Sequence, residues 1–226
     1  MHNVYIAEGE KIVDELLQAK SGLRAIYGLP AWIDARRDQL SNQSIEYHTI
    51  TEGELIKIST LSTPNQVLAI VDTPETILPK KLPEGLYVAL DNLQDPGNLG
   101  TIIRTADWFG FKGVICSENT VDAFNPKVVQ STMGSILHVP IWYGDLVEAF
   151  AANAHLPVMA ATLDGNNVFK SELPKSGILL IGNESKGVSP ELQQLASIRL
   201  NIPRSGKAES LNAAIAAGIL MGLLRR

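Results

Sequence analysis

Apolar and polar residues follow one another along the first third of the chain in blocks that predict alternating helices and strands. In residues 8–20, Ile12, Val13, Leu16 and Leu17 recur at helical intervals, which predicts an amphipathic helix. The same reasoning predicts the other elements of this part: strands at 23–29, 44–50 and 66–71, and helices at 31–40 and 52–61. Residues 1–72 are therefore predicted to form a small α/β domain.

A proline-rich segment follows at residues 73–85. It contains Pro74, Pro79 and Pro83, and prolines at this density favour an extended chain over a helix or a strand. We therefore predict a linker at 73–85 and a second domain from residue 86 to residue 226.

The second part alternates between strand and helix patterns over its whole length. This alternation predicts a mostly parallel sheet with helices on both faces, in which ligands bind at the carboxyl ends of the strands. The predicted strands are 86–92, 113–118, 139–144, 157–163, 178–183 and 197–203, and the predicted helices are 98–110, 125–136, 145–154, 189–196 and 210–225.

Composition and charge describe an ordinary folded protein. The chain has 226 residues, 45% hydrophobic and 19% charged, with a net charge of −5. Residues 1–72 hold six Lys or Arg against ten Asp or Glu, a net charge of −4. The chain is not a bulk polycation, and charge alone weighs mildly against a nucleic-acid partner, although a local basic groove is compatible with a negative total.

The few residues with special chemistry exclude several classes of protein. Cys116 is the single cysteine, which excludes a disulfide framework, and its GVIC context predicts a buried strand. The four histidines (His2, His48, His138 and His155) lie too far apart for a metal site. Trp32, Trp108 and Trp142 are predicted to be packing residues.

No segment predicts export or a membrane span. The N-terminus lacks the pattern of a signal peptide, and the most apolar run, 213–224, is shorter than the roughly 20 residues that a bilayer requires. We expect a cytoplasmic protein.

Three polar, glycine-containing segments stand at predicted strand ends. The segment at 201–212 is not a P-loop, because Asn201 stands where the first Gly is needed and Ala208 follows Lys207. It leads instead into a helix that Ser210 or Asn212 would cap. The other two segments are 90–110 and 179–192, and neither contains the G-x-G-x-x-G spacing of a dinucleotide site. Taken singly, each segment is compatible with an ordinary turn or loop.

Taken together and in this order, the three segments resemble the signature motifs of the SpoU (TrmH-type) family of RNA 2′-O-ribose methyltransferases, within the SPOUT class. The matching stretches are NLGTIIRTA at 98–106, IGNESKGV at 181–188 and IP-x5-ESLN at 202–212. The resemblance covers roughly residues 86–224. The N-terminal YIAEGEKIVDELL also looks like the small substrate-binding domain that precedes the catalytic domain in many members.

The resemblance implies an α/β fold with a deep C-terminal trefoil knot, a homodimer with the active site at the subunit interface, and S-adenosylmethionine as cofactor. Through the motifs it assigns Gly182, Ile202 and Leu211 to the cofactor site, with Thr162 and Leu163 as neighbours. It assigns Asn98, Arg104, Glu184, Ser210 and Asn212 to the catalytic group.

The implied reaction is methylation of a ribose 2′-hydroxyl in RNA. A guanidinium stays protonated in a protein, so we expect Arg104 to clamp a phosphate or the ribose, held by Asn98 or Glu184, while a phosphate oxygen or water takes the proton. Lys186, Arg204 and Lys207 are candidates for phosphate contacts. Ribosomal RNA is the expected substrate; a transfer-RNA methyltransferase and a non-catalytic RNA-binding protein on the same fold are the alternatives.

Overall fold

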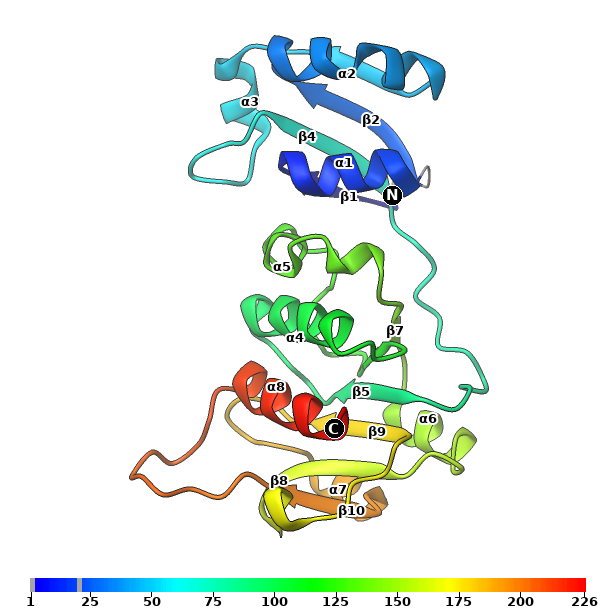
Figure 1. Ribbon diagram of the computed structural model, residues 1–226, viewed down its shortest axis with the longest axis vertical. Helices are drawn as coiled ribbons and strands as arrows, with labels where there is room; N and C mark the ends of the chain where they lie inside the picture. Colours follow the sequence, from blue (N-terminus) through cyan, green and yellow to red (C-terminus); the bar gives the residue numbers. More distant parts are fainter. Residues whose placement is uncertain (1–2, 20–21) are drawn as a thin grey trace.

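The chain folds into two α/β parts, each built on its own sheet. The computed structural model describes residues 3–19 and 22–226. Figure 1 shows the N-terminal part above the larger C-terminal part, with residues 73–85 running down one side between them. The sheet of the first part has the order β1-β4-β2-β3, and that of the second has the order β10-β8-β9-β5-β6-β7.

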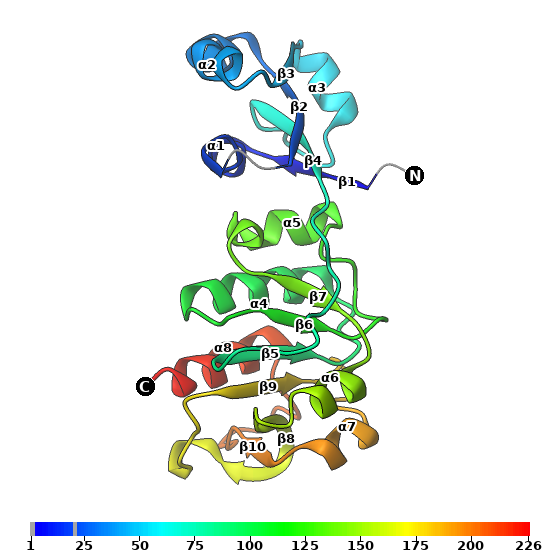
Figure 2. The same cartoon turned by 90° about the vertical axis from the view of Figure 1, so that its right-hand side faces the viewer.

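The N-terminal part confirms the predicted alternation and adds one strand that the pattern missed, β1. Strand β4 pairs antiparallel with β1 and β2, whereas β2 and β3 are parallel. Figure 2 shows α1 and α2 on one side of this sheet and α3 on the other. The elements are β1 (Val4–Glu8), α1 (Glu10–Ala19), β2 (Leu23–Gly28), α2 (Pro30–Asn42), β3 (Glu46–Thr49), α3 (Glu52–Ile58) and β4 (Val67–Asp72).

The C-terminal part confirms the predicted parallel sheet, since every strand pair described in it is parallel. Its strands are β5 (Leu86–Leu90), β6 (Val114–Cys116), β7 (Ile141–Tyr143), β8 (Val158–Asn167), β9 (Gly177–Ile181) and β10 (Ile198–Asn201). Its α-helices are α4 (Pro96–Trp108), α5 (Pro126–Thr132), α6 (Leu146–Ala152), α7 (Pro190–Leu195) and α8 (Ala213–Leu224). Short 3₁₀ helices cover Ser135–Leu137 and Val168–Lys170.

Side chains of the central strands alternate between two buried layers. Val88 and Leu90 of β5 join the core that includes α4 and α8, whereas Tyr87 and Ala89 join the core that includes α6 and α7. This is the period of two expected for a strand buried on both faces. Figure 2 shows α4 and α8 on one side of the sheet and α6 and α7 on the other. Cys116 lies inside this sheet, where burial raises the pKa of its thiol to about 12, so it is a structural thiol.

The helix predicted at 125–136 is shorter than the sequence indicated. It ends at Thr132, Met133 adopts a left-handed φ of 53°, and Gly134 follows with a φ of 98°. A Cβ on Gly134 would lie 2.5 Å from Oε2 of Glu15 in α1. The helix therefore ends in two left-handed residues, a common use of glycine at a helix C-terminus, and this end lies close to the N-terminal part.

The two parts are in direct contact through β1 and α5. The rings of Tyr5 and Phe124 have centroids 5.1 Å apart. His138 lies beside two carboxylates: its Nδ1 is 3.1 Å from Oδ2 of Asp107, and its Nε2 is 3.8 Å from Oε2 of Glu15 on α1. Both figures show α5 directly beneath β1. One buried core therefore continues from the first part into the second.

Predictions were also made for the tryptophans and for the other histidines. Trp32 is buried as predicted, but Trp108 is 84% exposed, so its interpretation as a packing residue is wrong for this chain alone. His48 stacks on Tyr27, and His155 contacts the carbonyl oxygen of Leu82. His2 lies outside the described residues.

The contact between α4 and α5 depends on Gly100. A Cβ at this position would lie 2.4 Å from Cβ of Ser131 and 2.8 Å from the carbonyl oxygen of Val128. We expect Gly100→Ala to lower the free energy of unfolding by about 1–3 kcal/mol, because overpacking outweighs the gain in helix propensity. Urea denaturation measures this change.

The matched control is Gly53→Ala, a helical glycine of α3 whose Cβ would meet nothing within 4 Å. It should be neutral or stabilising by about 0.5 kcal/mol. Equal effects of the two substitutions would show that the α4–α5 contact does not require a glycine.

Candidate active site

Three residues from the three sequence motifs meet at one edge of the parallel sheet. Asn98 lies in the first turn of α4, Glu184 follows β9, and Asn212 is the N-cap of α8. Helices α4 and α8 contact each other and lie side by side in Figure 1. The beginnings of two helices and the end of a buried strand thus converge, as expected for a ligand site of a parallel sheet.

A chain of hydrogen bonds joins these three side chains. Nδ2 of Asn98 donates to Oε1 of Glu184 at 3.1 Å, and Oδ1 of Asn98 accepts from Nδ2 of Asn212 at 2.9 Å. Oδ1 of Asn212 accepts from the backbone N–H groups of Ala214 and Ile215, at 2.9 and 3.2 Å. Each amide therefore has one orientation that satisfies its partners. Asn98, which is only 8% exposed, is the central member of the chain.

Glu184 also binds the loop that precedes α4. Its carboxylate accepts from the backbone N–H of Asp95 at 3.0 Å and from that of Gln94 at 3.3 Å. Partial burial raises the pKa of Glu184, but the N–H donors of Asp95, Asn98 and Gln94 act in the opposite direction and leave the pKa below its usual value. The group is therefore a carboxylate at neutral pH, and it holds the two loops together.

The loop after β9 is a tight turn that needs Gly182. Asn183 and Gly187 exchange backbone hydrogen bonds of 3.0 and 2.9 Å, and Gly187 has a left-handed φ of 68°. A Cβ on Gly182 would lie 2.1 Å from backbone atoms of Gly187 and Val188. Even alanine would therefore displace the turn that carries Glu184.

The predicted cofactor neighbours lie around the ends of β8 and β10. Thr162 and Leu163 are in β8, Ile202 directly follows β10, and Leu211 lies in the loop before α8. Oγ1 of Thr162 is buried without a hydrogen-bond partner in the described chain, whereas the side chains of Leu163 and Leu211 are 79% and 48% exposed. An unpartnered hydroxyl and exposed apolar side chains are features that a bound ligand would explain.

Two predicted members of the catalytic group stand apart from this hydrogen-bonded chain. Arg104 is exposed on α4, and within the described residues its guanidinium makes no hydrogen bond or ion pair. The expectation that Asn98 or Glu184 holds Arg104 is therefore wrong for a single chain. Ser210 is also exposed, and the cap of α8 is Asn212 alone, not Ser210.

Asp91 and Asn183 also shape the site, although neither is among the site residues predicted from the sequence. Oδ2 of Asp91 accepts from the backbone N–H of Ser189 at 2.7 Å, and Nδ2 of Asn183 donates to the carbonyl oxygen of Asn92 at 2.8 Å. Asn92 itself has a left-handed φ of 54°. Asp91 was noticeable in the sequence as a charged residue at the end of an apolar strand, a position where burial demands a partner.

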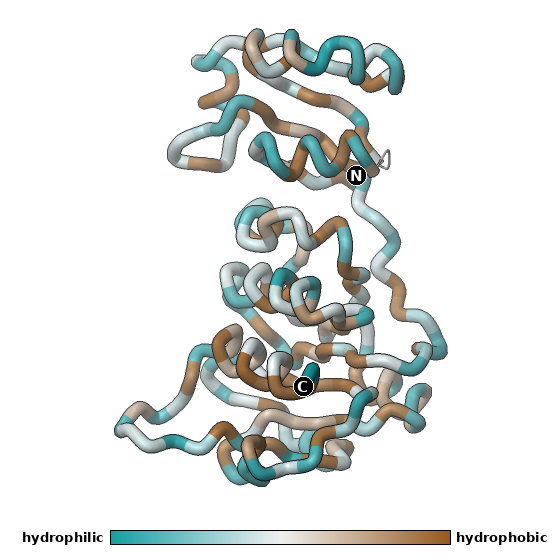
Figure 3. The backbone as a smooth tube through the Cα atoms, viewed as in Figure 1, coloured by the Kyte–Doolittle hydropathy of each residue, from teal (hydrophilic) through white to brown (hydrophobic). Residues whose placement is uncertain are grey.

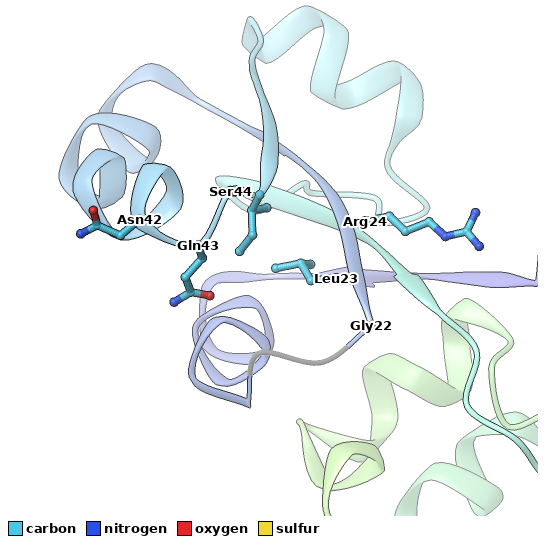
Figure 4. Close-up of a pocket in the computed structure, with 7 residues that line it drawn as sticks. Gly22, Leu23, Arg24, Asn42, Gln43 and Ser44 are labelled. Atoms are coloured by element: carbon cyan, nitrogen blue, oxygen red, sulfur yellow. The ribbon is translucent and has the colours of Figure 1, made fainter.

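Two cavities lie away from the motifs. One of about 290 Å³ lies in the N-terminal part, and Figure 4 shows Leu23, Gln43 and Ser44 around it. The other, of about 600 Å³, is lined by residues of β1, the 73–77 segment and the loop containing Phe124. Neither includes a predicted site residue.

Two kinds of feature are absent from residues 3–19 and 22–226. No group of three or more His, Cys, Asp or Glu side chains is arranged to hold a metal ion. No helix in these ranges is both long and apolar enough to cross a membrane.

Comparison with known families places the chain among RNA-modifying enzymes. Residues 85–222 match the model of the SpoU rRNA Methylase family, and residues 1–69 match the MRM3-like substrate binding domain. The first match covers more than half of the chain, and it contains all three motif segments. The chain belongs to the SpoU rRNA methylase family.

Individual relatives resemble this chain in sequence and structure over nearly its whole length. The 23S rRNA (guanosine(2553)-2′-O)-methyltransferase RlmP of Bacillus subtilis is 34% identical over 99% of this chain and 89% of its own. An AdoMet-bound rRNA methyltransferase from Sinorhizobium meliloti superimposes with a TM-score of 0.88 at 31% identity, over 99% of this chain and 87% of its own. The SpoU methyltransferase AviRb from Streptomyces viridochromogenes, in complex with AdoMet, has a TM-score of 0.83 at 28% identity, over 99% and 89% of the two chains.

The role of Glu184 as a carboxylate that holds two loops has a pH-dependent consequence. A glutamine there would place an N–H group against N–H donors, so near neutral pH we expect Glu184→Gln to lower the free energy of unfolding by about 1 kcal/mol. The pKa of Glu184 is lower in the folded state, so this stabilisation is present above the usual carboxyl pKa of 4.5 and is lost as the pH falls below it. Urea denaturation at neutral and acidic pH measures the difference.

Glu172→Gln is the matched control, because Glu172 is exposed and makes no hydrogen bond or ion pair within the described chain. The difference in the free energy of unfolding between wild type and Glu184→Gln should shrink in acid. The control should have the same free energy of unfolding as the wild type. If the loss of unfolding free energy in Glu184→Gln were the same at neutral and acidic pH, this role of the carboxylate would be excluded.

Proposed function

We propose that this protein transfers a methyl group from S-adenosylmethionine to a ribose 2′-hydroxyl of ribosomal RNA. The observation that carries the proposal is the hydrogen-bonded chain from Glu184 through Asn98 to Asn212, which joins the three family motifs at one edge of the sheet. Two relatives that match over nearly the whole chain, RlmP and the Sinorhizobium meliloti enzyme, are named as ribosomal RNA methyltransferases, which favours this substrate over transfer RNA.

The residues near β8 and β10 fit an adenosyl group. Such a ligand is neutral at its base and needs a few hydrogen bonds and apolar walls, not cationic side chains. The buried hydroxyl of Thr162, which has no partner among the described residues, offers one hydrogen bond, and the exposed side chains of Leu163 and Leu211 offer apolar surface. Gly182 and Ile202 complete the proposed cofactor set by bringing backbone close to it.

S-adenosylmethionine, when bound, supplies a methyl group activated by a sulfonium. The protein must then place the ribose hydroxyl and assist the loss of its proton, and alignment alone contributes several kcal/mol to such reactions. Asn98 and Asn212 hold the starts of α4 and α8 together, and Glu184 fixes the loop that precedes α4. We assign Ser210, exposed beside Asn212, to the RNA side of this group.

Arg104 is free to bind RNA because no group in the described chain occupies its guanidinium. Its planar fork of N–H donors suits a phosphate or the ribose oxygens. A guanidinium is a poor base, so a phosphate oxygen or a water molecule takes the proton. Exposed Lys186, Arg204 and Lys207 lie in the loops of the second and third motifs and add positive charge for the RNA backbone.

A homodimer would complete the site. Trp108 on α4 is 84% exposed, and Ile215 on the adjacent α8 is 56% exposed, on the helix pair that carries Arg104. Large apolar side chains gathered on one surface mark interfaces. A second copy packed on α4 and α8 would bury them and would bring its own residues near Arg104.

The two parts of the chain have different roles in this proposal. We assign residues 1–72 to RNA substrate binding, residues 73–85 to the linker and residues 86–226 to catalysis. The match of residues 1–69 to a substrate binding domain supports this division. The trefoil knot stays a prediction from the family resemblance, and a ribosomal RNA substrate would place the protein in the cytoplasm.

The proposed clamp by Arg104 makes Arg104→Lys a selective test. Lysine keeps the charge but cannot make the forked contact, so we expect the single-turnover rate of methyl transfer to fall by a factor of about 100, or about 2.7 kcal/mol. The affinity for S-adenosylmethionine should stay within about twofold, because Arg104 is assigned to the RNA. Arg226→Lys, at the exposed C-terminus, is the control. Near-normal turnover of Arg104→Lys would rule the clamp out.

The proposed dimer is tested at Trp108. Placing a charge in an apolar interface leaves it unpaired when buried, so Trp108→Arg should convert a dimer into monomers. Sedimentation velocity measures the mass directly. Phe169→Arg is the matched control, since Phe169 is 53% exposed but lies in the 3₁₀ helix after β8. A wild-type protein that sediments as a monomer at micromolar concentration would contradict the proposal.

A further inference from the structure

Strand β8 leaves its register with β10 in the segment that carries Thr162 and Leu163. Met159 and Ala160 pair with Ile198 and Arg199, but the next pair is Asn166 with Leu200. Five residues of β8, 161–165, are thus inserted between neighbouring positions of β10. We call residues 161–165 the β8 bulge. Bulges of this kind redirect side chains and are common beside functional sites.

The side chain of Asn201 binds the middle of the β8 bulge. Its Nδ2 donates to the carbonyl oxygen of Leu163 at 2.8 Å and to that of Thr162 at 3.3 Å. Farther along the bulge, Gly165 lies so close to β10 that a Cβ on it would be 2.6 Å from the carbonyl carbon of Arg199. One side-chain amide and one close backbone contact therefore set the course of the inserted residues.

This arrangement determines what the bulge can offer to a ligand. Asn201 donates to the carbonyl oxygens of both Thr162 and Leu163, so each already has one hydrogen bond before a ligand binds. Within the part of the chain that the structure describes, the hydroxyl of Thr162 is buried without a partner, and the side chain of Leu163 is 79% exposed. Among its side chains, the bulge thus offers a ligand the hydroxyl of Thr162 and the apolar surface of Leu163.

We propose that Asn201 is a positioning residue for S-adenosylmethionine, which holds the β8 bulge in the shape that receives the adenosyl group. An amide is suited to this task because one NH₂ group can donate to two carbonyl oxygens. Aspartate has almost the same size but would set a carboxylate against both carbonyls. The inference rests on the proposed function, because it takes the β8 bulge as part of the cofactor site.

The first experiment is calorimetric titration of S-adenosylmethionine into the wild type, Asn201→Ala and Asn201→Asp. We expect the Kd to rise at least tenfold in Asn201→Ala and further in Asn201→Asp. Asn201→Gln retains the donor group and should recover part of the affinity. The matched control is Asn166→Ala, an exposed asparagine just beyond the bulge without a side-chain hydrogen bond in the described chain; its Kd should stay within twofold.

The second experiment detects the positioning itself, without cofactor. Hydrogen–deuterium exchange of the unliganded proteins should show faster exchange at residues 161–165 in Asn201→Ala, with α4 unchanged. The loss of affinity should also be non-additive with Thr162→Val, because both substitutions act on the same bulge. The double variant should bind only slightly more weakly than the weaker single variant.

The outcomes separate this inference from the proposed function. Wild-type binding with an unchanged Kd in Asn201→Ala overturns the role of Asn201 alone. Faster exchange throughout the second part of the protein also overturns it, because Asn201 would then serve the whole fold. A wild-type protein that does not bind S-adenosylmethionine overturns both proposals together.

Discussion

The buried amide of Asn98 is the contact on which the candidate site depends. It is only 8% exposed and accepts from Asn212 while donating to Glu184. A buried amide left without partners costs roughly 1–3 kcal/mol per unsatisfied group. The loop after β9, the start of α4 and the start of α8 must therefore all be in place for Asn98 to be satisfied. One side chain thus couples three segments that are distant in sequence.

The surrounding fold allows this convergence because its strands are parallel and buried on both faces. The carboxyl ends of β5 and β9 lie together, since these strands pair directly. The backbone at that edge adopts left-handed conformations at Asn92 and Gly187, and it needs a glycine at 182. The left-handed conformation of Asn92, a residue with a Cβ, has a cost in stability that a site for a ligand would justify. On the same sheet, the apolar helix α8 is buried on its inner face, and the loop before it is polar, as Figure 3 shows.

Much of the fold was predictable because periodicity and prolines are local signals. The parallel sheet, the extended segment at 73–85 and nearly all helices followed from them. The early end of the 125–136 helix has a local signal that the periodicity obscured, because glycine often follows the last turn of a helix and Gly134 stands there. Strand β1 was missed although Val4, Tyr5 and Ile6 are residue types that favour strands.

The site was predictable in part, for a similar reason. The motifs indicated Asn98, Glu184 and Asn212, but the hydrogen-bond partners of Asn98 are determined by tertiary contacts. Arg104 is six residues from Asn98, and residues on a common helix face are three or four apart, so its separation from the chain of hydrogen bonds has a simple geometric reason. Asn201 carried no local signal at all. The role proposed for it follows only from its hydrogen bonds and from the break in register between β8 and β10.

The most direct test of the account is to locate the transferred methyl group. Purified protein is incubated with ribosomal RNA and S-adenosylmethionine labelled in its methyl group, and the RNA is then hydrolysed in alkali. A methyl on the ribose 2′-oxygen blocks cleavage at that nucleotide, so we expect the label in a single alkali-resistant dinucleotide. Label on a base, or no transfer to ribosomal RNA by a protein that binds the cofactor, would contradict the proposed reaction.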